Sequence, residues 1–404
     1  MFDHHHVSSF PNSTVAFIFF KLIILFYASL QVLIITGNSC VKVVMLNRPR
    51  KLNSLNHEMV SQLLRSLRLY ENDSSVKLVI LKGNAKAFCS GGDVLATVTC
   101  SLTGHWTYPL IFYRKALTLN HLVATYKKLM VCLIDGVAMG GGATLSMNAT
   151  FRIITENAIF AMPEVHIGHF PDAGASYFLS RLPGYFGEYL GLTGTRLKGA
   201  EMLACGLATH FIPSMRLQSL ENALQAVTSS NVSTIATLIE TFANKAYARK
   251  NSSFMRLEII NKCFSKETVE DIIHTLENEL LENGTEKWIT DALNSMRSAS
   301  PISLKITLKL IRKSRIQNIE ECLYRDYNIA SHVIRGTVSY DLFEGSRAKL
   351  FDKDNKPKWE PSKLELVSEE MVDQCFKSVN HDEWERLQLP DRSNNSQSIT
   401  SCKL

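Results

Sequence analysis

Ala87-Phe88-Cys89-Ser90-Gly91-Gly92-Asp93 is a glycine-rich stretch that follows an apolar run at residues 76–81. Asp135-Gly136-Val137-Ala138-Met139-Gly140-Gly141-Gly142 follows a second such run, at residues 131–134. Short apolar runs that end at glycine predict buried β-strands. Neither stretch contains the P-loop pattern GxxxxGK[ST] or the dinucleotide pattern GxGxxG, so nothing here predicts a site of either kind.

Glycines at the ends of two strands allow the backbone to approach a ligand closely. If a helix begins at Gly141, the free N–H group there points outward with the helix dipole behind it. Two such loops side by side would direct two N–H donors at one oxygen. Such an oxyanion hole contributes roughly 3–4 kcal/mol per donor in acyl transfer. The residues alone leave a second interpretation open, in which these glycines serve only tight turns and close packing.

A third stretch, residues 161–174, carries two carboxylates, Glu164 and Asp172, in a loop rich in Gly and Pro. Such a loop has no helical period and can turn both acids toward one point. An apolar surrounding raises the pKa of a carboxyl group and suits it to act as a base. Two surface acids are the alternative. His166 and His169 lie in the same loop, but a lone loop histidine is more often solvated or packed, so neither is included in the predicted site.

The order of predicted elements changes at about residue 230. Residues 31–230 alternate strands, glycine turns and helices, with a first strand at 32–35 before a turn at Gly37-Asn38, which predicts an α/β core. Residues 231–379 show helical periodicity, and Pro301 after Ser300 is a typical helix start. Residues 380–404 are polar and predict a loosely packed tail. The expected C-terminal helices span 232–247, 267–283, 286–298, 301–315 and 319–335.

The composition is that of a globular protein, with 404 residues, 46% apolar and 20% charged. This excludes a disordered chain and a disulfide miniprotein. The net charge of +6 is a mild excess without a basic run, which argues against nucleic-acid binding and suits an anionic small ligand. The nine cysteines are odd in number and lack zinc spacing, which predicts reduced thiols in an intracellular compartment.

Both ends of the chain have features of targeting segments. Residues 15–35 are mostly apolar and carry one charge, Lys21. This segment is long enough for a membrane helix, but the predicted strand at 32–35 takes up its end and leaves a stretch that is short for a membrane span. A membrane anchor, a targeting segment and an atypical extension therefore stay open for residues 1–30. The chain ends in Cys402-Lys403-Leu404, which is similar to Ser-Lys-Leu, the address that the peroxisomal import receptor reads.

Taken together, these segments resemble the crotonase (enoyl-CoA hydratase/isomerase) superfamily. Within it they resemble the 3-hydroxyisobutyryl-CoA hydrolase family, particularly its plant peroxisomal members, from about Gln31 to the C-terminus. The residues that carry this resemblance are Leu46-Asn47-Arg48-Pro49, the two glycine-rich stretches, Phe160-Ala161-Met162-Pro163-Glu164, Phe170-Pro171-Asp172, Leu192-Thr193-Gly194, Arg196-Leu197, Ser300-Pro301, Asp352-Lys353-Asp354 and Pro357-Lys358-Trp359.

The resemblance implies a fold of class α/β, a crotonase-like spiral of ββα repeats with a helical C-terminal region. It implies hydrolysis of a short hydroxyacyl-CoA thioester in valine catabolism, with coenzyme A as part of the substrate and no separate cofactor or metal. The amides of Ser90 and Gly141 would hold the thioester oxygen. Glu164 would be the catalytic carboxylate, which either attacks the thioester carbonyl or activates water, and Asp172 would bind the substrate hydroxyl or position water. The other substrate-binding residues it implies are Gly91, Gly92 and Asp93, while Arg50 and Lys51 are either near CoA phosphates or a solvated turn.

Four positions depart from the patterns of the superfamily, and one of them is His169, which replaces a usually apolar residue beside the predicted catalytic loop. Hydratases place a second Glu where this chain has Thr144, which favours hydrolysis over hydration. The family's substrate-contacting Glu aligns with Ala116, and Lys115 adds a cation beside it, so a non-catalytic acyl-CoA-binding relative stays an alternative, as does a hydratase or isomerase. The sequence leaves membrane association and oligomeric state open.

Overall fold

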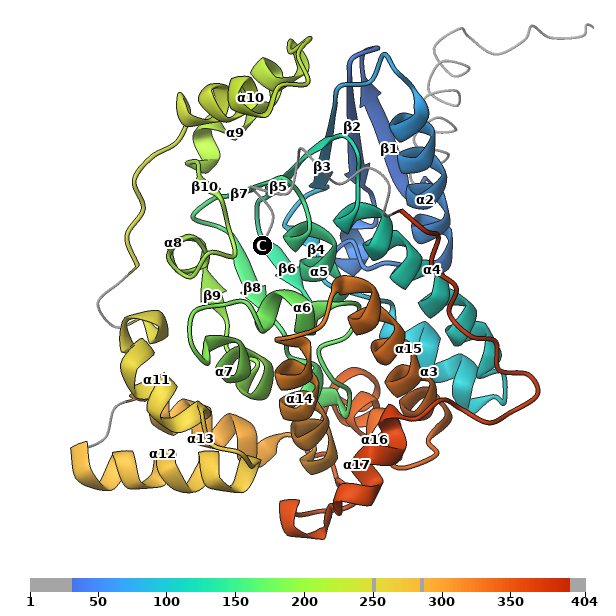
Figure 1. Cartoon of the computed structure of the whole chain (residues 1–404), viewed down its shortest axis with the longest axis vertical. Helices are drawn as coiled ribbons and strands as arrows, with labels where there is room; N and C mark the ends of the chain where they lie inside the picture. Colours follow the sequence, from blue (N-terminus) through green and yellow to red (C-terminus); the bar gives the residue numbers. More distant parts are fainter. Residues whose placement is uncertain (1–30, 249–251, 284–286, 393–404) are drawn as a thin grey trace, which may run out of the picture.

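The larger of two β-sheets has six strands in the computed structural model, which describes residues 31–248, 252–283 and 287–392 (Figure 1). A hairpin of β1 and β2 is antiparallel, with its turn at Gly37, and all other neighbours are parallel. The predicted first strand and its turn are therefore confirmed. The strand order is β1 (Leu33–Gly37), β2 (Val41–Leu46), β3 (Leu78–Gly83), β5 (Leu129–Ile134), β7 (Phe151–Ile154) and β10 (His210–Phe211).

Side chains on the central strands alternate between two apolar layers, as the period of two requires. Val43 and Ile80 face the layer of α9 (Ser214–Gln225) and α10 (Val232–Glu240). Val44 and Leu81 face the layer of α2 (His57–Asn72) and α4 (Thr107–Ala124). The sheet is therefore covered on both faces, which is why its strands read as continuous apolar runs.

The smaller sheet positions the loops that the sequence analysis singled out. Its strands β4 (Ala87–Cys89), β6 (Val137–Met139) and β8 (Ile159–Ala161) are parallel neighbours, and β9 (Leu197–Lys198) pairs antiparallel with β8. The three parallel strands lead into Ser90, Gly140 and Met162. Since the carboxyl ends of parallel strands meet at one edge of a sheet, the three loops come together there.

Helices are the main elements in the rest of the described chain. Helix α14 begins at Pro301 as predicted, and the Ser300 side chain accepts a hydrogen bond from the Ser303 N–H. Helix α10 ends at Glu240, seven residues before the predicted end. The remaining α-helices are α3 (Val94–Leu102), α5 (Gly141–Met147), α6 (Ala175–Leu179), α7 (Phe186–Thr193), α8 (Gly199–Ala204), α11 (Leu257–Phe264), α12 (Val269–Asn283), α13 (Lys287–Ser298), α14 (Pro301–Ser314), α15 (Ile319–Arg335), α16 (Asp341–Ser346) and α17 (Glu369–Phe376).

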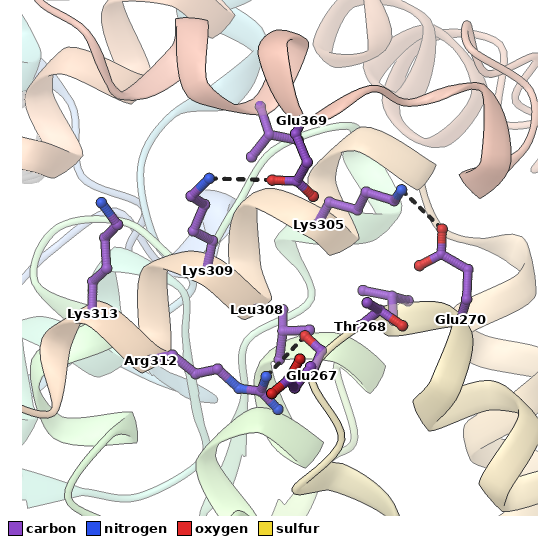
Figure 2. A pocket seen from close by; sticks show the side chains of 11 residues that line it. Glu267, Thr268, Glu270, Lys305, Leu308, Lys309, Arg312, Lys313 and Glu369 are labelled. Atoms are coloured by element: carbon purple, nitrogen blue, oxygen red, sulfur yellow. Dashed lines mark hydrogen bonds and ion pairs between the residues drawn. The ribbon is translucent and has the colours of Figure 1, made fainter.

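Helix α14 lies between α12 and α17, and Figure 2 shows how its cations reach both. Lys305 pairs with Glu270 at 2.8 Å, and Lys309 pairs with Glu369 at 3.3 Å. Arg312 donates to the carbonyl oxygen of Glu267 at 2.9 Å. These side chains border a hollow of about 330 Å³. The cations are already paired with acidic groups or carbonyls of neighbouring segments, which indicates that they brace the helices.

The helical C-terminal region shares its core with the α/β region. Phe170 and Ala173 of the predicted catalytic loop pack in one cluster with Ile302 of α14 and Leu323 of α15. The compositional change near residue 230 therefore marks a change of secondary structure and not a break in the core.

The polar tail predicted from residue 380 has mostly exposed residues and no helix or strand over its described part, but it is anchored to the helices at Trp384 and Arg392. The Trp384 ring stacks on Tyr327 of α15 with centroids 5.8 Å apart, and its Nε1–H donates to Ser331 Oγ at 3.0 Å. Arg392 donates to Thr125 Oγ1 at the end of α4. The segment runs back along α4 (Figure 1). Tryptophan buries a large apolar area even in a polar stretch, which the composition of the tail concealed.

The proposed peroxisomal tripeptide and residues 1–30 lie outside the described residues. Within the described residues, no helix combines the length and the apolar character that a membrane crossing needs.

Candidate active site

A cavity of about 550 Å³ lies at the carboxyl ends of β4, β6 and β8. The loops after these strands form one side, α4 forms the wall opposite, and residues 342–355 form part of the rim. Six of the predicted site residues line it: Ser90, Gly91, Gly92, Gly141, Glu164 and Asp172. The structure therefore brings together residues that lie far apart in the chain.

The amide of Ser90 is not available to a ligand, which corrects its predicted role as an oxyanion donor. Its N–H donates to the carbonyl oxygen of Leu52 at 3.0 Å. The amides of Gly92 and Gly141 have no backbone partner within the described ranges, and both residues line the cavity. They are close neighbours, since a Cβ added to Gly141 would lie 3.9 Å from the Gly92 nitrogen. Gly92 and Gly141 are therefore a pair of donors suited to a thioester oxygen, and the amide of Gly91 beside them also has no backbone partner among the described residues.

Asp93 does not line the cavity, although it was predicted to bind substrate. Its carboxylate pairs with Arg48 at 2.9 Å and accepts a hydrogen bond from the Ala96 N–H at 3.4 Å. Asp93 is thus the N-cap of α3 and fixes the loop that carries Gly92. Spacing in the sequence could not distinguish a residue that faces the ligand from one that faces the opposite way.

Glu164 opens a short 3-10 turn, Glu164–Ile167, directly after β8. Its side chain lines the cavity and is 6% exposed, and its Oε2 atom has no hydrogen-bond partner among the described residues. Burial, with a smaller contribution from the charge of Asp172, raises the pKa of Glu164 well above its ordinary value. A carboxyl group of this kind is suited to general acid–base chemistry.

Asp172 belongs to a cluster of three polar side chains beside Glu164. Its Oδ2 atom lies 3.4 Å from His169 Nε2, and the same nitrogen lies 2.8 Å from Tyr113 Oη on α4. All three residues line the cavity. The sequence analysis left His169 out and did not consider Tyr113. The place of His169 in the sequence, between the two carboxylates, could have indicated its role. Tyr113 joins the cluster only because α4 packs against this loop.

The second histidine of this loop, His166, also lines the cavity. Its Nε2 atom lies 3.0 Å from Ser295 Oγ and 3.2 Å from the Thr193 carbonyl oxygen. Burial lowers its pKa below the ordinary value, which favours the neutral ring. His166 therefore ties the loop to α7 and α13.

Lys115 and Ala116, which depart from the family pattern, occupy different environments. Ala116 lines the cavity and offers it only a methyl group. The Lys115 Nζ atom lies 2.7 Å from His57 Nε2 and 3.1 Å from Ser61 Oγ, both on α2. The added cation is therefore held by α2, outside the lining of the cavity.

The cations of the cavity rim are Arg196 and Lys349. Lys349 Nζ donates to Asn355 Oδ1 at 3.1 Å. Arg50 and Lys51, which the resemblance placed near CoA phosphates, are exposed residues of the turn Pro49–Lys51 and do not line the cavity. Across the described ranges, no group of three or more His, Cys, Asp and Glu side chains is arranged to hold a metal ion.

The comparisons with known proteins agree with this architecture. A model of the family "Enoyl-CoA hydratase/isomerase" matches residues 41–376. The chain belongs to the enoyl-CoA hydratase/isomerase family. The crystal structure of a carnitinyl-CoA dehydratase from Mycobacterium thermoresistibile is similar to this member, with a TM-score of 0.80 and 30% identity, covering 89% of this chain and 98% of that one. The predicted fold class, a crotonase-like α/β fold, is thereby confirmed.

Relatives of this family member carry more than one kind of name. The probable 3-hydroxyisobutyryl-CoA hydrolase 3 of Arabidopsis thaliana is 49% identical over 368 residues, which cover 91% of this chain and 97% of that protein. The mitochondrial 3-hydroxyisobutyryl-CoA hydrolase of Xenopus laevis is 39% identical, with 86% and 89% covered. The small ribosomal subunit protein mS47 of Arabidopsis thaliana is 40% identical, with 88% of each chain covered.

Proposed function

We propose that this chain hydrolyses the thioester of 3-hydroxyisobutyryl-CoA, releasing 3-hydroxyisobutyrate and coenzyme A. The observation that carries the proposal is the juxtaposition in one cavity of two free amides, Gly92 and Gly141, with the buried carboxylate of Glu164. The hydrolase relatives support the same reaction. Valine breakdown is the pathway that this substrate suggests.

The reaction needs one base and one oxyanion site. The ionised Glu164 carboxylate takes a proton from water, and the resulting hydroxide adds to the thioester carbonyl carbon. The amides of Gly92 and Gly141 hold the oxygen that becomes negative. When the C–S bond breaks, the departing thiolate takes the proton back from Glu164, so the enzyme returns to its starting state.

Thr144 supports hydrolysis over hydration. It is fully buried on α5, and its hydroxyl donates to the Gly140 carbonyl oxygen at 3.3 Å. A two-carboxylate addition of water to an enoyl-CoA would need a second acid at this place. A buried, internally bonded hydroxyl cannot supply it.

Thiol release from 3-hydroxyisobutyryl-CoA by the full chain tests the proposal. Glu164→Gln keeps the shape of the side chain and removes the base, so we expect release to fall by about 10²-fold or more. The matched control is Glu258→Gln, an exposed glutamate of α11, which should release thiol at the wild-type rate. Undiminished release by Glu164→Gln would remove Glu164 from the mechanism.

A second candidate is a protein that binds acyl-CoA without hydrolysing it. Ala116 in the cavity wall favours it, since this position offers no carboxylate to the substrate. Calorimetric binding of 3-hydroxyisobutyryl-CoA by wild-type protein that releases no thiol would select this candidate. In that case Ala116→Glu is the variant expected to restore turnover.

We also propose import into peroxisomes through Cys402-Lys403-Leu404, because a small residue, a cation and a terminal leucine match the receptor-read address. A fluorescent protein fused before residue 31, with the C-terminus free, should colocalise with a peroxisomal marker. Deleting Leu404 should leave it dispersed. Mitochondrial fluorescence that is unchanged by the deletion of Leu404 would refute this targeting signal.

A further inference from the structure

Tyr113, His169 and Asp172 form a connected polar group that lines the cavity. Tyr113 stands on α4, whereas His169 and Asp172 stand on the loop after β8, so the group joins opposite walls. His169 is 5% exposed and Asp172 is 9% exposed. The mechanism proposed above uses none of the polar atoms of Tyr113 or His169.

The surroundings of the imidazole decide which nitrogen carries the proton. His169 Nδ1 is buried and has no hydrogen-bond partner among the described residues. A proton there would be a buried donor without an acceptor, which is costly. His169 Nε2 has two oxygen neighbours, Tyr113 Oη at 2.8 Å and Asp172 Oδ2 at 3.4 Å. The proton therefore belongs on Nε2, and this N–H is a donor to the group.

The phenol of Tyr113 keeps its proton as well. Burial, followed by the charge of Asp172, raises the pKa of Tyr113 well above its ordinary value. The group thus offers two donors, the Nε2–H of His169 and the O–H of Tyr113, around one carboxylate acceptor. A hydroxyl group both donates and accepts, so it fits such a mixed set better than a purely donating or purely accepting group does.

Most of the rest of this wall is apolar, although the buried amide side chain of Asn120 on α4 also lines it. Phe112, Ala116 and Leu117 line the cavity on the same helix as Tyr113. They suit the hydrocarbon part of a short branched acyl chain. The polar side chains beside them are those of Asn120 and of Tyr113 with its two partners.

We propose that Tyr113 and His169 determine specificity for the hydroxyl group of the acyl chain, acting together with Asp172. The substrate hydroxyl donates to Asp172 and accepts from the Tyr113 hydroxyl, which His169 holds in place. This inference rests on the proposed function, because it assigns the group that distinguishes 3-hydroxyisobutyryl-CoA from isobutyryl-CoA. A site built to hydrogen-bond a hydroxyl rejects an analogue that lacks it, because its buried polar groups are then left unpaired.

The test compares kcat/KM of the full chain for 3-hydroxyisobutyryl-CoA and isobutyryl-CoA. The wild type should prefer the hydroxylated thioester. Tyr113→Phe and His169→Leu should each reduce this preference by about 3- to 10-fold, the range of one hydrogen bond. His169→Gln, which keeps an N–H near the position of Nε2, should retain most of the preference. Tyr189→Phe is the matched control, since Tyr189 is a buried tyrosine outside the cavity that accepts a hydrogen bond from Thr195.

The ratio of the two rates distinguishes recognition from a merely structural role. An equal loss for both thioesters in Tyr113→Phe, with an unchanged ratio, would overturn the inference. If the wild type releases thiol from neither substrate, the proposed function fails, and the same preference is then measured as a ratio of dissociation constants by calorimetry. A hydroxyl preference in binding that Tyr113→Phe abolishes would still support the inference, and equal affinity of the wild type for both thioesters would overturn it.

Discussion

Glu164 combines two properties that a single side chain rarely has in a globular protein, burial and a missing partner. Its Oε1 atom lies so close to Gly140 that a Cβ there would approach it to 2.7 Å. Gly140 also has φ +52°, a region that residues with a side chain adopt at a cost. The glycine therefore allows both the turn and the approach of the carboxylate.

The first prediction concerns the pH dependence of hydrolysis. Protonated Glu164 cannot accept a proton from water, so kcat/KM should rise with pH through the raised pKa of Glu164. The charge of Asp172 is one cause of that raised pKa. Asp172→Asn should therefore move the midpoint of the rise to lower pH, although the rate also falls. Asp382 is an exposed aspartate, and the pH profile of Asp382→Asn should match that of the wild type. An unshifted midpoint in Asp172→Asn would contradict the electrostatic coupling between Asp172 and Glu164.

The second prediction concerns Gly140. Gly140→Ala places a methyl group against the Glu164 carboxylate and should lower kcat by at least about 10-fold, as misplacement of a catalytic group does. Gly206→Ala is the matched control, because Gly206 has φ +89° and nothing within 4 Å of an added Cβ. Gly206→Ala should lower the free energy of unfolding by about 1 kcal/mol, because alanine adopts a positive φ at a cost. It should leave the rate of thiol release unchanged. Equal kcat values for Gly140→Ala and Gly206→Ala would show that the close approach of Gly140 to Glu164 does not affect catalysis.

At the scale of elements, helix α15 stabilises the loop after β8, which carries Glu164 and Asp172. Asp326 on α15 is 1% exposed and accepts a hydrogen bond from the Gly174 N–H at 2.7 Å. Ala173 and Gly174 both have positive φ, so this segment follows an uncommon path. The hydrogen bond from Asp326 holds the turn just after Asp172. The loop is thus fixed by a helix that lies about 150 residues later in the sequence.

The third prediction follows from the environment of Asp326. Burial raises the pKa of Asp326 to about 7, from an ordinary value near 3.8. The folded protein therefore binds this proton more tightly than the unfolded chain, and the contribution of Asp326 to stability falls as the pH rises from about 4 to about 7. Asp326→Asn accepts the same hydrogen bond without a charge. Relative to the variant, the wild type should lose stability between about pH 4 and about pH 7 in urea unfolding. A difference independent of pH would refute the assignment.

At the scale of the whole molecule, the C-terminal segment closes the structure. Residues 381–392 connect α15 to the ends of α2 and α4 through Trp384 and Arg392. The ring of Tyr327 takes part twice, since it stacks on Trp384 and its hydroxyl donates to the Glu385 carbonyl oxygen at 2.9 Å. Because α15 also holds the catalytic loop, the packing of this segment supports the site from a distance.

The fourth prediction concerns this closure. Trp384→Ala removes the stacked ring and its hydrogen bond and should lower the free energy of unfolding by about 2 kcal/mol, less than for a fully buried aromatic residue. Trp384→Phe keeps the stack and should cost about 1 kcal/mol. Urea unfolding at constant pH measures both. A cost below about 0.5 kcal/mol for Trp384→Ala would mean that the segment does not stabilise the fold.

The sequence by itself determined several strands, most of the C-terminal helices and the residue types of the site. Glycine after a buried run, the apolar periods and the Ser300-Pro301 cap act over a few residues, so strands, turns and helix starts could be read locally. The glycine-rich stretches and Glu164 were found in the same way, because their chemistry is contained in short motifs.

Only the tertiary structure decided which atoms face the ligand. The amide of Ser90 is not free because it donates to Leu52, some 40 residues earlier, and Asp93 faces Arg48 instead of the cavity. Tyr113 joins His169 because α4 packs against the loop after β8. The direction of a side chain or an N–H group is set by contacts between distant segments, and a one-dimensional pattern does not contain those contacts.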